Sequence, residues 1–154
     1  MSAMRIGNGI DHHQLIKSEC EQNLGGLSFK LNYQIQAFSD GDVILHSISS
    51  AILGALSESD LGTFFPDFKK ENQNLDSKTI LNKCLQMMVQ KNFEIVNVDI
   101  TIVCESIYFA PIILQIKKNL ITLLKTQNIS VKATRFEKES DMISTYCVLL
   151  LKSK

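Results

Sequence analysis

The sequence predicts a single α+β domain, a mixed β-sheet with helices packed on one face. Three observations support this fold class. Strand-like and helix-like segments interleave along the chain, apolar residues recur at helical spacing in three segments, and no linker-like stretch divides the 154 residues. A chain of this length is close to the commonest size for one domain, so we expect residues 1–154 to fold as one unit.

The first strands are predicted from short apolar runs next to glycines. Met4 to Gly9 is typical of a strand, and Leu27 to Leu31 forms a second one after the Gly25-Gly26 turn. Between them, Gln14 to Leu24 is mostly polar and is predicted to be a loop.

Three helices are predicted from apolar spacing and end signals. The first starts near Asp40 or Asp42, either of which can cap it, and runs to Ala55. Asp76 can cap the second, which ends near Lys91-Asn92. The third tolerates Pro111 in its first turn and ends near Lys125.

The remaining segments are predicted to be strands and one connection. Ile95 to Cys104 is rich in Val and Ile and is predicted to be a buried strand. Ile129 to Thr134 and Thr145 to Leu151 form the last two strands, and Phe68 to Asp76 is a polar connection. Strands and helices therefore alternate, as a mixed sheet with helices on one face requires.

Charge and composition exclude several classes of function. Basic and acidic residues balance at 16 each, so no strong field would draw the chain to nucleic acid or to an anionic membrane. The chain has no signal-like leader and no apolar run long enough to cross a bilayer. We expect a cytoplasmic protein with its four cysteines reduced, and a plastid location stays open if a leader has been removed.

Asp11 and His13 are the first candidate metal ligands. In an extended backbone they share a face, while His12 points away. His46 in the first helix is a possible third ligand, and one carboxylate with two imidazoles would leave zinc an open fourth position. Each residue alone is also consistent with a polar turn or with a core histidine.

Acidic residues in predicted loops form a second group, Asp60, Asp67 and Glu137. The segment from Asp60 to Asp67 mixes Gly, Pro, aromatic residues and carboxylates, which is typical of a shaped loop that hydrogen-bonds a polyol. Solvated surface carboxylates remain the alternative for each of the three.

Five segments form a more specific pattern when taken together: Met4-Arg-Ile-Gly-Asn-Gly-Ile-Asp-His-His13, Ser39-Asp-Gly-Asp-Val-Ile-Leu-His46, Asp60-Leu-Gly-Thr-Phe-Phe-Pro-Asp67, Asn97-Val-Asp-Ile-Thr-Ile, and Val131-Lys-Ala-Thr134 followed by Glu137. In order and spacing they resemble the motifs of the 2-C-methyl-D-erythritol 2,4-cyclodiphosphate synthase family. The resemblance covers nearly the whole chain.

The resemblance implies a homotrimer with sheets around a central axis and an active site at each subunit interface. It also implies a phosphorus–oxygen lyase of non-mevalonate isoprenoid precursor synthesis. Such an enzyme converts 4-diphosphocytidyl-2-C-methyl-D-erythritol 2-phosphate to 2-C-methyl-D-erythritol 2,4-cyclodiphosphate and releases CMP by intramolecular phosphoryl transfer.

The resemblance also assigns roles to residues. Asp11, His13 and His46 correspond to zinc ligands, and Glu137 corresponds to the ligand of a second ion, magnesium or manganese. The catalytic positions implied are Glu137, Arg135 and Thr134. The substrate-binding positions implied are Asp11, His13, Phe38, Ser39, Asp60, Gly62, Phe65, Asp67, Thr134 and Glu137.

Several positions depart from the family pattern. Phe38 stands where the family usually has His, and Arg135 where it usually has Thr; Arg could supply a donor to phosphate in its place. Ser50 replaces a usual Asp, and the loop after Glu137 is shortened. Two other functions stay open at this point, a zinc-bound trimeric homologue that binds a nucleotide or a partner without turnover, and a zinc phosphohydrolase.

Overall fold

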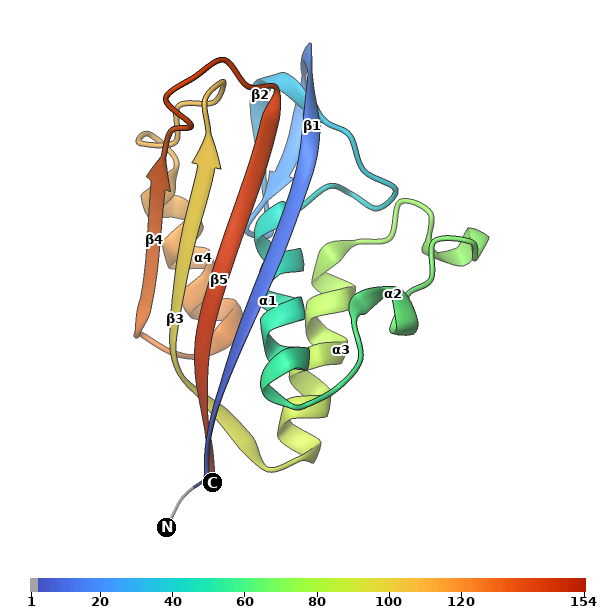
Figure 1. Ribbon diagram of the computed structural model, residues 1–154, viewed down its shortest axis with the longest axis vertical. Helices are drawn as coiled ribbons and strands as arrows, with labels where there is room; N and C mark the ends of the chain where they lie inside the picture. Colours follow the sequence, from blue (N-terminus) through green and yellow to red (C-terminus); the bar gives the residue numbers. More distant parts are fainter. Residues whose placement is uncertain (1–2) are drawn as a thin grey trace.

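One mixed five-stranded sheet forms the framework of the computed structural model, which describes residues 3–154 (Figure 1). The strands lie in the order β2-β1-β5-β3-β4. Neighbours are antiparallel except for β3 and β4, which run parallel. Their bounds are Met4–Leu24 for β1, Leu27–Ile35 for β2, Phe93–Cys104 for β3, Ile129–Thr134 for β4 and Met142–Ser153 for β5. The predicted mixed β-sheet is therefore confirmed.

The helices cover one face of this sheet (Figure 1). Helix α1 (Val43–Ala55) packs on β1 and β5, α3 (Ser77–Gln90) packs on α1 and β3, and α4 (Ile113–Leu124) packs on β4. A short helix, α2 (Leu61–Phe64), and a 3-10 turn, η1 (Lys70–Asn72), lie between α1 and α3. Among residues 3–154, no helix has the length and hydropathy needed to cross a bilayer.

The predicted loop from Gln14 to Leu24 is wrong. These residues continue β1, which leaves its pairing with β5 and pairs instead with β2, from Leu15 opposite Ile35 to Leu24 opposite Leu27. None of residues 16–23 is fully buried, so the strand shows no alternation of apolar and polar residues. Backbone pairing with β2, which the sequence pattern does not show, makes this segment a strand.

Other boundaries shift by a few residues. Helix α4 begins at Ile113, so Pro111 lies in the preceding turn and not in the first helical turn as predicted. Strands β2, β3 and β5 each extend beyond the predicted range, because backbone pairing continues past the apolar core positions. The four cysteines are free thiols, as expected, and burial raises the pKa of Cys147 to about 12.

Two glycines in β1 allow α1 to approach the sheet closely. A Cβ atom at Gly7 would collide with the carbonyl oxygen of Ala51, and one at Gly9 with that of Ser47. Only glycine fits where two backbones approach this closely. The consequence is that the first turns of α1 lie directly beside the segment of β1 that follows Gly9.

Asp42 fixes where α1 begins. Its buried carboxylate accepts hydrogen bonds from the backbone N–H groups of Leu45 (3.0 Å), Gly25 (2.9 Å) and Gly26 (2.8 Å). Burial raises the pKa of Asp42, although these three hydrogen bonds oppose the shift. One side chain thus ties the β1–β2 turn to the start of α1, whereas Asp40 accepts from Ser77 at the start of α3.

The sheet face away from the helices carries an uncovered apolar belt. Met4, Ile6 and Ile10 of β1 are 61%, 71% and 52% exposed, and Tyr146 and Val148 of β5 are 44% and 46% exposed. These strands are paired neighbours, with Ile10 opposite Tyr146, so the exposed side chains form one surface. An apolar surface of this kind commonly marks an interaction site.

Candidate active site

Asp11, His13 and His46 come together where β1 passes the first turn of α1. Asp11 and His13 lie on the helix face of β1, and the intervening His12 is exposed. The Asp11 Oδ2 atom is 3.0 Å from His13 Nε2 and 3.3 Å from His46 Nδ1. The alternation predicted from the sequence is therefore found in the structure.

The local fold explains why His46 reaches β1. Its backbone N–H donates to the carbonyl oxygen of Asp42 (3.0 Å), so His46 lies in the first turn of α1. The close approach at Gly9 brings that turn beside Asp11. Two features of the chain, a helix cap and a glycine, thus place the third side chain of the triad.

Electrostatics favour an ionised carboxylate in this cluster. Burial acts to raise the pKa of Asp11, but hydrogen bonds with His13 and His46 outweigh it and the pKa is lowered. The hydrogen bond with Asp11 raises the pKa of His13, even though burial opposes this. The cluster therefore stabilises one negative charge and attracts positive charge, either a proton or a metal ion.

The donor set fits a divalent transition metal. The three potential ligand atoms lie within 4.8 Å of one another, and all three residues are half-buried. Within residues 3–154, no other group of three or more His, Cys, Asp or Glu side chains converges in this way. One carboxylate and two imidazoles are ligands that suit zinc and leave a coordination position for a substrate atom.

A cavity of about 290 Å³ surrounds the triad. It is lined by eight residues that the sequence predicted, which are Asp11, His13, Phe38, Ser39, His46, Gly62, Phe65 and Asp67. The Ser39 hydroxyl lies 3.3 Å from His46 Nε2. The segment from 61 to 67 therefore shares this cavity with the triad, although its residues are distant from Asp11 in sequence.

Asp60 does not line this cavity. Its carboxylate accepts from the backbone N–H and the hydroxyl of Thr63, both at 2.9 Å, and so caps α2. In this structure Asp60 shapes the loop that carries Gly62 and Phe65.

Sequence reasoning missed Asn72, Leu75 and Ile80, which also line the cavity. Asn72 was part of a segment predicted to be a plain connection, and its side-chain amide donates to the carbonyl oxygen of Pro66 (2.9 Å). An uncharged amide in a polar run gives no pattern that would single it out. Only the structure shows that the connection after residue 67 places Asn72 against the segment from 61 to 67.

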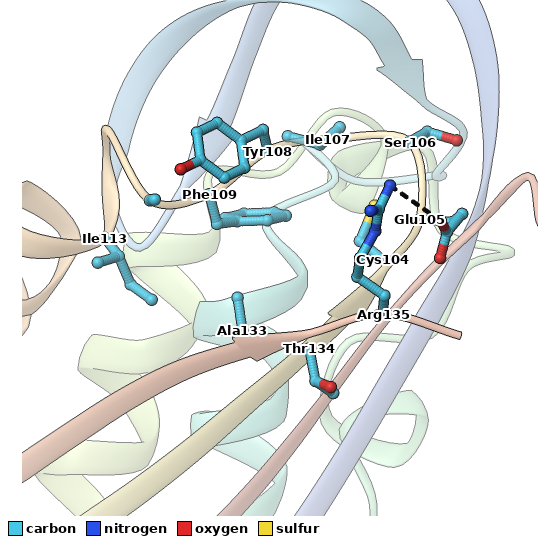
Figure 2. A pocket seen from close by; sticks show the side chains of 11 residues that line it. Cys104, Glu105, Ser106, Ile107, Tyr108, Phe109, Ile113, Ala133, Thr134 and Arg135 are labelled. Atoms are coloured by element: carbon cyan, nitrogen blue, oxygen red, sulfur yellow. Dashed lines mark ion pairs between the residues drawn. The ribbon is translucent and has the colours of Figure 1, made fainter. Parts of the chain in front are cut away.

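A second cavity, of about 680 Å³, lies at the ends of β3 and β4 (Figure 2). Its lining combines Thr134 and Arg135 with the segment that follows β3 and includes Ile107, Tyr108 and Phe109. Arg135 Nη2 lies 3.0 Å from Glu105 Oε1, and Figure 2 shows the two side chains directed toward one another.

The chain alone does not gather all of the predicted site residues. The two cavities share no lining residue among those described. Glu137 lines neither of them and is an exposed loop residue with φ of 58°, a left-handed conformation that is uncommon for a residue with a side chain. Three groups of predicted residues therefore lie apart from one another in the chain.

Comparisons with known proteins agree on one family. The YgbB family model matches residues 4–152. A 2-C-methyl-D-erythritol 2,4-cyclodiphosphate synthase of Leptospira borgpetersenii serovar Hardjo-bovis is 45% identical over 155 residues, with 96% of each chain covered. The synthase of Mycoplasmoides gallisepticum is 40% identical, again over 96% of each chain.

A solved structure supports the same relationship. The IspF of Plasmodium falciparum in complex with CDP superposes with a TM-score of 0.86 at 33% sequence identity, covering 99% of this chain and 97% of the other. Fold and sequence therefore agree over essentially the full length.

Proposed function

The chain belongs to the YgbB family, and from this membership we propose that it acts as a 2-C-methyl-D-erythritol 2,4-cyclodiphosphate synthase. The observation that carries the proposal is the convergence of Asp11, His13 and His46 in a cavity shared with the segment from 61 to 67. Relatives over nearly the whole chain bear this enzyme's name, so the activity belongs to isoprenoid precursor synthesis.

The reaction needs positioning more than covalent catalysis. An oxygen of the substrate's 2-phosphate attacks the β-phosphorus, a new P–O bond closes the ring, and the bond from the β-phosphorus to the bridging oxygen breaks. CMP leaves with that oxygen. Holding the two phosphates in line and neutralising their charge lowers the barrier of such a transfer.

The triad cavity is proposed to hold the methylerythritol part and its phosphates. Asp11, His13 and His46 would bind zinc, which when bound supplies Lewis-acid polarisation of a phosphate oxygen. Ser39 can donate from its hydroxyl, while Gly62, Phe65 and Asp67 form another part of the cavity wall. Asp60 supports that wall through its cap on α2. Phe38 can only contribute contact area, since its ring has no donor.

The second cavity is proposed to take the cytidine nucleotide. Its volume and mainly apolar lining suit a base and a ribose, and Thr134 and Arg135 supply a hydroxyl and a cation for phosphate. The Plasmodium falciparum relative was solved with CDP. Arg135 would then donate where the family usually has Thr, and its fork matches phosphate oxygens.

Glu137 is proposed to bind the second ion, magnesium or manganese. A single protein carboxylate is enough when phosphates of the substrate complete the coordination, as is usual for magnesium. Its exposed position in the loop after β4 is consistent with a ligand that acts only when substrate is present.

A homotrimer is proposed because one subunit leaves both an apolar face and a divided site. The belt of Met4, Ile6, Ile10, Tyr146 and Val148 is uncovered within the described chain. Packing of three such faces around an axis would bury it, and a neighbouring subunit could bring its second cavity to the triad cavity. The cytoplasmic location and the absence of nucleic-acid and membrane partners remain predictions from composition.

The deciding experiment measures CMP release from the cytidyl substrate by the purified protein with zinc and magnesium. Glu137→Gln should abolish turnover, whereas Glu139→Gln, which removes a nearby exposed carboxylate, should retain it. CMP formation without the cyclic product would indicate hydrolysis. Nucleotide binding without product would indicate the non-catalytic homologue, and either result would overturn the proposal.

A further inference from the structure

We propose that Glu105 regulates nucleotide affinity by holding Arg135 across the second cavity and competing with the nucleotide phosphate for its guanidinium. Glu105 is thereby a positioning residue whose negative charge favours release of the nucleotide product. The inference rests on the proposed function, because it takes the second cavity as the nucleotide site.

The topology places the two side chains at one edge of the sheet. Strands β3 and β4 run parallel, and Val103 of β3 is in register with Thr134 of β4. Glu105 and Arg135 therefore follow the last paired positions of their strands, at the same edge. Their ion pair, 3.0 Å from Nη2 to Oε1, lies among the side chains that line the second cavity (Figure 2).

Both members of the ion pair keep polar atoms that the pair itself does not use. The Oε2 atom of Glu105 is buried and has no hydrogen-bond partner among the described residues. The Arg135 side chain is 71% exposed, and within residues 3–154 its one ion pair runs through Nη2. A guanidinium has five donors, so several stay available for an anion. The guanidinium end of the pair is open to water, so a phosphate can reach it, but the Glu105 carboxylate, which is 24% exposed, then loses its cation, and this loss opposes nucleotide binding.

The charges of the cavity lining make Arg135 the natural contact for phosphate. Among the eleven lining residues, Arg135 is the sole cation and Glu105 the sole carboxylate. A phosphate that binds the guanidinium must therefore displace the carboxylate from it. Uncharged cytidine offers no phosphate to compete with Glu105, so the effect of Glu105 should be confined to charged nucleotides.

A purely structural role for Glu105 predicts something different. If its carboxylate only held the segment from 105 to 110 in place, its loss would loosen the cavity wall. Binding of cytidine, CMP and CDP would then weaken together, and the melting temperature would fall.

The test compares the affinities of cytidine, CMP and CDP by calorimetry for the parent protein, Glu105→Gln, Arg135→Thr and the double variant. Glu105→Gln should bind CMP and CDP about three- to tenfold more tightly and leave cytidine within about twofold. Arg135→Thr should weaken CMP and CDP. In the Arg135→Thr background, adding Glu105→Gln should change CDP affinity by less than about twofold, because Glu105 affects phosphate binding through its ion pair with Arg135.

Glu94→Gln is the matched control, because Glu94 lies at the other end of β3 and pairs with Lys152. It should leave all three affinities unchanged. Equal or weaker CDP binding by a folded Glu105→Gln variant would overturn this inference while the proposed function stands. If Glu105→Gln does not fold, CDP binding by Arg135→Thr as tight as that of the parent would overturn it instead. A parent protein that binds no cytidine nucleotide would overturn both the inference and the proposed function.

Discussion

The hydrogen bond between Asp11 and His13 makes metal binding compete with a proton. It is the main cause of the raised pKa of His13, so the imidazole stays protonated to a higher pH than usual. A protonated imidazole cannot coordinate a metal. Asp11, whose pKa is lowered, stays ionised at the pH values where His13 titrates. At a pH where His13 is protonated, the triad therefore loses a proton when it takes up a metal ion.

The first prediction follows from this competition. Zinc affinity should fall as the pH drops through the raised pKa of His13, by up to about tenfold per pH unit below it, with up to about one proton released per zinc bound. Calorimetry in buffers of different ionisation enthalpy measures both quantities. His12→Ala, which removes the neighbouring exposed imidazole, should show the same pH dependence. An affinity that stays constant from pH 6 to pH 8 would contradict the expectation.

Phe38 lies in the triad cavity at the position where the family pattern has His. It lines the triad cavity beside Ser39 without offering a donor to phosphate. We predict that Phe38→His raises kcat by about tenfold, since a hydrogen-bond donor aimed at developing charge lowers the barrier. Phe38→Leu, which changes shape without adding a donor, should not raise it. Steady-state CMP release gives the answer, and an unchanged kcat in Phe38→His would mean that another group already fills the role.

At the scale of elements, the start of α1 matters because it positions His46. The carboxylate of Asp42 satisfies three backbone N–H groups, one in α1 and two in the β1–β2 turn, and it is buried. Asp76 caps α3 from an exposed position with a single bond to the N–H of Lys78 (2.8 Å). The two caps are chemically alike and differ in burial and in the number of bonds.

We predict that losing the Asp42 cap destabilises the protein more than losing the Asp76 cap. Asp42→Ala should lower the free energy of unfolding by about 3 kcal/mol, because buried N–H groups lose their partner. Asp76→Ala should cost about 1 kcal/mol, as is usual for an exposed cap. Chemical denaturation measures both values. Equal losses for the two variants would show that the buried bonds of Asp42 contribute little.

At the scale of the whole molecule, the sheet face without helices is a large apolar surface that no part of the described chain covers. The apolar belt on this face is formed by side chains of two paired strands. Phe68 is also exposed, at 86%, but it lies in a loop outside the belt and therefore serves as a comparison. If the belt is the subunit interface, a charge placed in it must be desolvated on assembly, which is costly.

We therefore predict that Ile6→Glu dissociates the trimer into monomers and abolishes turnover, since the divided site would not be completed. Phe68→Glu should leave the assembly intact. Light scattering on size-exclusion fractions reports the mass of each species. A monomeric parent protein, or a trimer that tolerates Ile6→Glu, would contradict the proposed interface.

Much of the fold could be predicted from the sequence, because several elements carry a clear pattern of apolar residues. The spacing of apolar residues predicted α1, α3 and α4, because helix burial follows a period that the sequence displays directly. The second half of β1 was not accessible, since its exposed side chains carry no burial pattern. Its strand conformation depends on hydrogen bonds to β2, and backbone groups leave no trace in the order of side chains.

The sequence by itself determined the chemistry of this protein: the donor types, the alternation of Asp11 and His13, and the succession of motifs typical of its family. The tertiary structure decided how those groups meet. The close approach at Gly9 places His46 beside Asp11, and the parallel ends of β3 and β4 place Arg135 beside Glu105. Contacts of this kind join residues far apart along the chain. They arise from packing and strand register, which a local sequence pattern does not specify.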